Sequence, residues 1–79
     1  SEVSIGGMNY QLTPSQSKIV KVLYESACEG VDKLTYQEIA NRTGLTSYSR
    51  LSSYFQAELR VFDLFKYSKR DRRYSLITE

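Results

Sequence analysis

The stretch LTYQEIANRTGLT, residues 34–46, decides how the rest of this sequence is organised. Thr35 and Glu38 have the spacing of a capping box, in which each side chain hydrogen-bonds the backbone N–H of the other residue and so begins a helix. Ile39 supplies an inward-facing apolar residue, and Gly44 can adopt the left-handed conformation that ends a helix. We therefore predict a short helix followed by a tight turn.

A further helix is predicted after this turn, over residues 45–62 (LTSYSRLSSYFQAELRVF), with Thr46 or Ser47 as its cap. Its apolar residues recur three and four positions apart, which is the spacing of one continuous buried stripe. The stripe would consist of Tyr48, Leu51, Phe55, Leu59 and Phe62, and the outward face would carry Ser47, Ser49, Arg50, Ser53, Tyr54 and Ala57.

Another helix is predicted upstream, within residues 12–30 (LTPSQSKIVKVLYESACEG). Thr13 and Gln16 form a second capping box, Pro14 suits the first helical position, and Gly30 ends the helix. Its apolar face would be made of Ile19, Val20, Leu23, Tyr24 and Ala27.

The remaining segment before residue 34 favours extended structure. The opening SEVSIGGMNYQL, residues 1–12, has apolar residues on both sides of Gly6-Gly7 and predicts a short hairpin. The piece VDKLT, residues 31–35, is predicted as an isolated extended segment.

The C-terminal part changes to strand-like runs at residues 64–68 and 72–77, with Lys69, Arg70 and Asp71 between them. This pattern predicts a hairpin with a charged tip, in which Tyr67 and Tyr74 are cross-strand partners. Residues 46–79 carry seven Lys/Arg and four Asp/Glu, a balance of +3, whereas residues 1–45 carry four and five, a balance of −1. Such asymmetry favours a polyanionic partner, although a solvated basic face would look the same.

Composition limits the function further. A chain of 79 residues predicts a single domain, divided here into residues 1–12, 13–62 and 63–78. The sequence has no histidine, no phosphate-binding loop and no paired acids, so we expect no catalytic residues, no metal, no cofactor and no small-molecule substrate. The single Cys28 is predicted to be a buried or half-buried thiol. Without an apolar run or a signal peptide, we expect a cytoplasmic protein with no membrane contact, either processed or part of a longer chain.

The segment from Leu12 to Leu76 resembles a winged helix-turn-helix DNA-binding domain. The likeness rests on LTYQEIANRTGLT for the helix-turn-helix, AELRVFDLF (residues 57–65) for the exit from the third helix, and FKYSKRDRRYSLI (residues 65–77) for the wing. The opening VSIGGMNYQLTPSQSKIVKVLY, residues 3–24, is similar to the start of winged-helix response regulators. The resemblance implies an α+β fold of three helices with a C-terminal hairpin wing and a short N-terminal hairpin.

The resemblance also implies a double-stranded DNA partner, bound by a transcriptional regulator or by a replication, partition or mobile-element protein, in the cytoplasm or on the nucleoid. The third helix would enter the major groove, the second helix would place its first turn near a phosphate, and the wing would follow the flanking backbone or minor groove. The implied DNA-binding residues are Ser47, Ser49, Arg50, Ser53 and Tyr54 in the third helix, Tyr36 and Gln37 in the second, and Lys69, Arg70, Arg72 and Arg73 in the wing.

Two other functions remain open from the sequence. The first is a protein-interaction module, because the third helix is rich in Ser and Tyr and the net charge is only +2. The second is binding of RNA or single-stranded DNA by the tyrosines and arginines of the wing.

Overall fold

The computed structural model describes the backbone of residues 2–5, 8–55 and 65–77 and, within these ranges, the side chains from Asn9 onward. In chain order its elements are β1 (Glu2–Ile5), β2 (Met8–Gln11), α1 (Pro14–Cys28), β3 (Leu34–Thr35), α2 (Tyr36–Thr43), the 3-10 helix η1 (Leu51–Phe55), β4 (Phe65–Ser68) and β5 (Arg73–Leu76). The described residues therefore form an α+β fold with two α-helices and a three-stranded antiparallel sheet.

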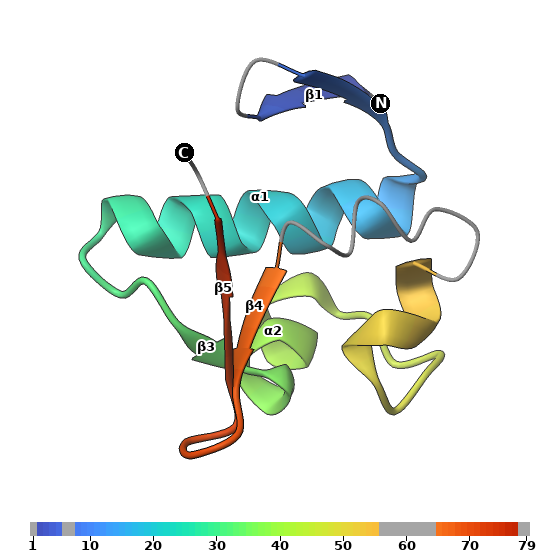
Figure 1. Ribbon diagram of the computed structural model, residues 1–79. Helices are drawn as coiled ribbons and strands as arrows, with labels where there is room; N and C mark the ends of the chain where they lie inside the picture. Colours follow the sequence, from blue (N-terminus) through green and yellow to red (C-terminus); the bar gives the residue numbers. More distant parts are fainter. Residues whose placement is uncertain (1, 6–7, 56–64, 78–79) are drawn as a thin grey trace.

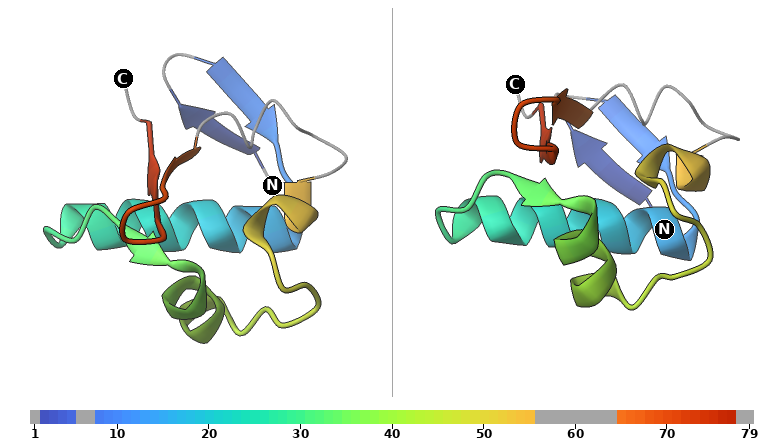
Figure 2. Two further views of the ribbon diagram at one scale, coloured as in Figure 1. Left: turned by 60° about the horizontal axis from the view of Figure 1, so that its bottom comes forward. Right: turned by 90° about the horizontal axis from the view of Figure 1, so that it is seen from below.

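Helix α1 separates two parts of the molecule (Figure 1). The predicted N-terminal hairpin is present, with β1 paired to β2 in register Val3 to Tyr10, and it lies on one side of α1. In that view helix α2, η1 and the β4–β5 turn lie on the other side, and α2 stays opposite the hairpin across α1 in both views of Figure 2. Residues from three separate segments are thus brought to one end of the molecule.

Both predicted capping boxes are confirmed. At the start of α1, the Thr13 side chain accepts from the Gln16 N–H at 3.2 Å, and the Gln16 side chain accepts from the Thr13 N–H at 3.1 Å. The matching distances between Thr35 and Glu38 at the start of α2 are 3.1 and 2.9 Å. Gly44 ends α2 in the left-handed conformation, with φ 74°.

The short strand β3 is not the isolated segment that the sequence predicts. It pairs with β5, Leu34 opposite Tyr74 and Thr35 opposite Arg73, so that the sheet order is β3-β5-β4. The turn between β4 and β5 covers residues 69–72, so Arg72 belongs to the turn and not to the predicted second strand. This pairing fixes the β4–β5 turn beside the start of α2, because β3 leads directly into that helix.

The core of the described residues is built from apolar residues of α1, β3, α2, η1 and β4, together with Leu12. The buried residues are Leu12, Ile19, Val20, Leu23, Leu34, Ile39, Leu51, Phe55 and Phe65, and the rings of Phe55 and Phe65 lie 5.1 Å apart. On α1, the predicted face is wrong at two positions, since Tyr24 and Ala27 are exposed. Gln16 and Ser26 are buried instead, and the Ser26 hydroxyl donates to the Val31 carbonyl where the chain turns back.

The predicted third α-helix is not confirmed. Residues 47–50 form no helix, residues 51–55 form only η1, and the predicted positions Ala57, Leu59 and Phe62 lie outside the described residues. Leu51 and Phe55 are buried as expected, but Tyr48 is 50% exposed. The Tyr48 peptide is held by two side chains, because its carbonyl accepts from the Tyr36 hydroxyl and its N–H donates to the Tyr54 hydroxyl. These bonds replace helical ones.

Candidate nucleic-acid interface

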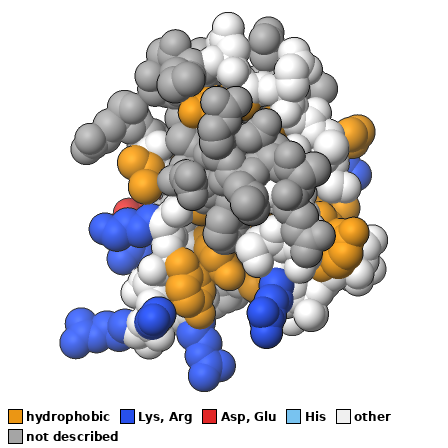
Figure 3. All heavy atoms as spheres, turned by 45° about the vertical axis from the view of Figure 1, so that its right-hand side comes forward, with side chains coloured by type: hydrophobic (Ala, Val, Ile, Leu, Met, Phe, Trp, Pro, Cys, Tyr) orange, Lys and Arg blue, Asp and Glu red, His pale blue; other side chains and the backbone are white. Residues whose placement is uncertain are grey.

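The basic residues of the β4–β5 turn are all at the surface. Lys69, Arg70, Arg72 and Arg73 are exposed, and none of them is in an ion pair with another described side chain. In Figure 3, Lys and Arg side chains gather along the lower edge of the face, on both sides of an apolar patch. Unpaired exposed cations of this kind are available to phosphate groups.

One acid lies within this turn. Asp71 accepts a hydrogen bond from the Ser68 side chain, and this bond, with Lys33 and Arg73 nearby, holds the pKa of its carboxyl below the ordinary value. Asp71 is therefore ionised at neutral pH and offsets part of the charge of its neighbours. The turn keeps an excess of positive charge, because four cations face one carboxylate.

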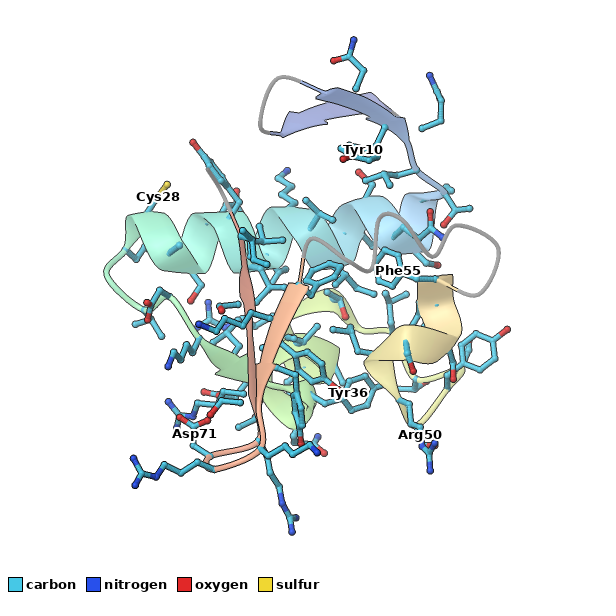
Figure 4. The ribbon with its side chains drawn as sticks, in the orientation of Figure 1. Tyr10, Cys28, Tyr36, Arg50, Phe55 and Asp71 are labelled. Atoms are coloured by element: carbon cyan, nitrogen blue, oxygen red, sulfur yellow. The ribbon has the colours of Figure 1, made fainter. Side chains whose placement is uncertain are left out.

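Arg50 brings a further positive charge to the same end of the molecule. Figure 4 shows Arg50 and Asp71 at this end, from opposite sides of the fold, with Tyr36 between them. The Arg50 guanidinium acts on the Tyr74 phenol in β5, where it partly opposes the rise in pKa that burial causes. Arg50 and the β4–β5 turn therefore contribute to one electrostatic surface, although they are distant in sequence. We call this surface the basic face; it consists of Arg50, Lys69, Arg70, Arg72 and Arg73.

The other predicted residues of the third helix differ in their environment. Ser47 and Ser49 are exposed, and Ser53 is half-buried. Tyr54 is half-buried and packs against Tyr48: its hydroxyl accepts from the Tyr48 N–H at 3.3 Å, and the two rings meet edge-on at 5.0 Å. The Tyr54 carbonyl accepts from the Gln16 amide at 2.8 Å. The structure thus leaves Ser47, Ser49 and Arg50 accessible and uses Tyr54 for packing.

The charge of the capping residue Glu38 changes the electrostatic potential at the start of α2. Gln37 is exposed and Tyr36 half-buried, but Glu38 lies in the same turn. The Thr35 N–H, which donates to the Glu38 carboxylate, holds the pKa of that carboxyl below the ordinary value. An ionised Glu38 opposes the attraction of the helix end for a phosphate.

Sequence reasoning missed a cluster of tyrosines beside the basic face. Burial, followed by the hydrogen bond with Tyr54, raises the pKa of Tyr36 to about 12. Tyr67 and Tyr74 pair across β4 and β5, as predicted, with ring centroids 4.7 Å apart. The high tyrosine content of the chain was a signal for such a cluster, but the residues meet only through long-range contacts.

A hollow of about 430 Å³ lies between the start of α2 and the β4–β5 turn. Its lining residues are Thr35, Tyr36, Gln37, Tyr67, Asp71, Arg72 and Tyr74. It therefore combines three aromatic rings with one cation and several polar groups. No local pattern indicates this hollow, because its lining comes from β3, α2 and the β4–β5 hairpin, which only the sheet pairing brings together.

A second hollow, of about 500 Å³, is lined by Val22, Tyr24, Glu25, Cys28, Glu29 and Arg42. Cys28 is exposed there, so the prediction of a buried or half-buried thiol is wrong. Its sulfur is hydrogen-bonded with Tyr24, and this bond is the main cause of the raised pKa of that phenol.

No three His, Cys, Asp or Glu residues among the described ones are grouped as metal ligands would be. No helix in the described ranges has the length and apolarity needed to cross a membrane.

Comparison with known proteins adds no relative. A scan against models of protein families, a search of curated proteins and a search of solved structures each found no match to this chain.

Proposed function

We propose that this domain binds double-stranded DNA as a winged helix-turn-helix domain, with the β4–β5 turn as its wing. The observation that carries the proposal is the basic face: cations from residue 50 and from residues 69–73 are exposed at one end of the molecule. Each contact between such a cation and a phosphate releases condensed counterions, which is the main source of affinity for duplex DNA. A transcriptional, replication or partition protein would use the domain for this purpose.

The arrangement of elements supports the winged-helix part of the proposal. The order α1, β3, α2 is followed by the β4–β5 hairpin, and β3 pairs with that hairpin. Residues 45–50 follow α2 without helical structure, so we assign phosphate contact rather than base reading to most of the interface. Arg50 is the residue best suited to read a base edge, because a guanidinium can bond guanine O6 and N7 together.

Titration of a fluorescently labelled random duplex over a series of salt concentrations tests this proposal. Contact with about four to six phosphates predicts a slope of log affinity against log salt of about −4 to −5. The double variant Arg70→Ala/Arg73→Ala removes two phosphate contacts and should flatten the slope by about 2. The matched control Lys18→Ala/Lys21→Ala removes the same charge from exposed positions of α1 and should change the slope much less. An equal change of slope in the two double variants would show that the β4–β5 turn is not part of the interface.

A protein partner is the alternative that one observation favours. Tyr48 is 50% and Tyr67 45% exposed, and exposed aromatic residues are enriched in protein interfaces. Binding of this kind depends on apolar contacts and survives high salt. Absence of duplex binding at low salt would favour this function over the one proposed.

A further inference from the structure

We propose that the hollow between α2 and the β4–β5 turn binds a single unpaired nucleobase of a nucleic-acid strand, stacked on Tyr67, with Arg72 at the adjoining phosphate. The inference rests on the proposed DNA binding, because the basic face would hold the remainder of the strand. It adds a site for a base that has left the helical stack, which phosphate contacts alone do not require.

The aromatic lining supports a planar ligand. Tyr67 is 45% exposed although one part of its ring packs against Tyr74, so the ring keeps accessible surface toward the hollow that it lines. Tyr36 contributes a third ring. Every base has a π-face, and stacking on an aromatic side chain therefore accepts any base.

Polar groups line the same hollow and can meet the edge of a base. The Gln37 amide nitrogen donates to Asn41 at 3.1 Å, which leaves the Gln37 carbonyl oxygen as an acceptor. The Asp71 carboxylate is a second acceptor. Acceptors of this kind suit the exocyclic amino group of adenine or cytosine. We therefore choose adenine as the probe.

Arg72 has a backbone conformation that favours glycine. Its φ is 57°, and it is the one described residue other than glycine with a positive φ. A side chain in this region is strained, and such strain persists mainly where the residue has a use. The Arg72 side chain lines the hollow, so its guanidinium is available for the phosphate beside a stacked base.

The hollow is unsuited to a free small molecule, because it is open to solvent and bounded by side chains of a surface turn. A base that belongs to a strand needs less enclosure, since the basic face beside the hollow carries the charge that complements the strand. An unpaired base also enters without the cost of breaking a base pair. These properties favour a nucleotide within a polymer over a free nucleotide.

Competition binding with three duplexes tests the inference. The duplexes are identical except that one is fully paired, one carries a single bulged adenine and one carries an abasic bulge. We expect the bulged adenine to bind about 10-fold more tightly than the other two, as a stacked base would require. Equal affinity for the adenine and abasic bulges would overturn the inference, because the bulge would then act only through flexibility of the backbone.

Substitutions in the hollow separate its role from that of the basic face. Tyr67→Leu keeps an apolar side chain against Tyr74 without a π-face, and should abolish the preference for the bulged adenine. Tyr67→Phe should retain it. Because Arg72 belongs to both the hollow and the basic face, Arg72→Gly should reduce affinity for the bulged adenine more than for the fully paired duplex, without lowering the unfolding temperature. A preference unchanged in Tyr67→Leu would contradict the site.

The two proposals fail in different ways. Salt-dependent binding of all three duplexes with equal affinity would overturn the base site and leave the proposed DNA binding intact. Failure of all three duplexes to bind at low salt would overturn both.

Discussion

Tyr36 lies at the first position of α2, and its hydroxyl donates to the Tyr48 carbonyl. The resemblance to a winged helix implied that this residue, in the first turn of the second helix, lies near a phosphate. The fold instead directs its hydroxyl to a peptide group twelve residues further along the chain. Such a bond depends on where the tyrosine side chain reaches in three dimensions, which a local pattern does not contain.

The half-buried phenol of Tyr36 should make stability depend on alkaline pH. Its pKa is about 12 in the folded protein against an ordinary value of 10.0, because burial and the neighbouring Tyr54 disfavour the phenolate. The stability from this group is therefore complete below pH 10.0 and is lost as pH rises toward about 12, since the unfolded chain ionises first.

Tyr36→Phe should remove this part of the alkaline dependence and cost about 1 kcal/mol at neutral pH through loss of the hydrogen bond. Urea unfolding at neutral and alkaline pH, with tyrosinate absorbance, measures both effects. Parallel loss of stability in the variant and the parent protein would show that another group controls the alkaline range.

Arg72 provides a second prediction at the scale of one residue. Replacement by glycine relieves the strain of a positive φ, so Arg72→Gly should raise the free energy of unfolding by about 1 kcal/mol. Arg70→Gly is the matched control, because Arg70 is also exposed and has a negative φ; this change should leave stability unchanged or lower it. Thermal or urea unfolding of both variants gives the comparison, and a loss of stability in Arg72→Gly would refute the argument from strain.

At the scale of elements, the starts of α1 and α2 could be predicted, whereas the non-helical backbone of residues 47–50 could not. A capping box involves residues three apart, so Thr13 with Gln16 and Thr35 with Glu38 can be recognised locally. The apolar spacing of residues 48–62 also has a helical period, yet Tyr48 is not in a helix, and its N–H donates to the Tyr54 hydroxyl. Side-chain hydrogen bonds from Tyr36 and Tyr54 hold the Tyr48 peptide outside a helix, in a segment rich in serine.

The carboxyl of Glu38, at the start of α2, should make the stability of the fold depend on acid pH. Its folded-state pKa lies below the ordinary value of 4.5, mainly because the Thr35 N–H donates to the carboxylate. The stability from this group is complete above pH 4.5 and is lost as pH falls below that value through the folded-state pKa.

Glu38→Gln keeps an oxygen for the cap but removes the charge, so unfolding experiments should show lower stability at neutral pH and a weaker acid dependence. Asp71, whose pKa is also lowered, should supply much of the remaining dependence, and Asp71→Asn is the companion variant. An unchanged acid dependence in Glu38→Gln would contradict this assignment.

At the scale of the whole molecule, the sheet order and the basic face follow from pairings that the sequence does not indicate. The two residues of β3 are too few to show a period, and they pair with β5 some forty positions away. The basic residues 69–73 could be recognised as a charged hairpin tip. Their position at the same end of the molecule as Arg50 and Tyr36 depends on this pairing and on the attachment of η1 to α1.

That attachment depends on Gln16, which is only 3% exposed. One end of its amide accepts from the Thr13 N–H and completes the cap of α1, while the other end donates to the Tyr54 carbonyl at 2.8 Å. A single side chain therefore joins the start of the first helix to the segment that carries Arg50. We expect its removal to affect the basic face as well as stability.

Gln16→Ala should lower the free energy of unfolding by about 2 to 4 kcal/mol, because it removes a cap and leaves the Tyr54 carbonyl without its donor. It should also weaken the near-ultraviolet circular dichroism of the Tyr48–Tyr54 pair and reduce duplex affinity, since Arg50 would no longer be held at the same end of the molecule as the β4–β5 turn. The control Thr13→Ala removes the cap alone and should cost about 1 kcal/mol without changing that spectrum. Equal loss of stability in both variants, with an unchanged spectrum, would contradict this prediction. The bond from Gln16 to Tyr54 would then have no part in holding η1, and the position of Arg50 would depend on the apolar contacts of Leu51 and Phe55 alone.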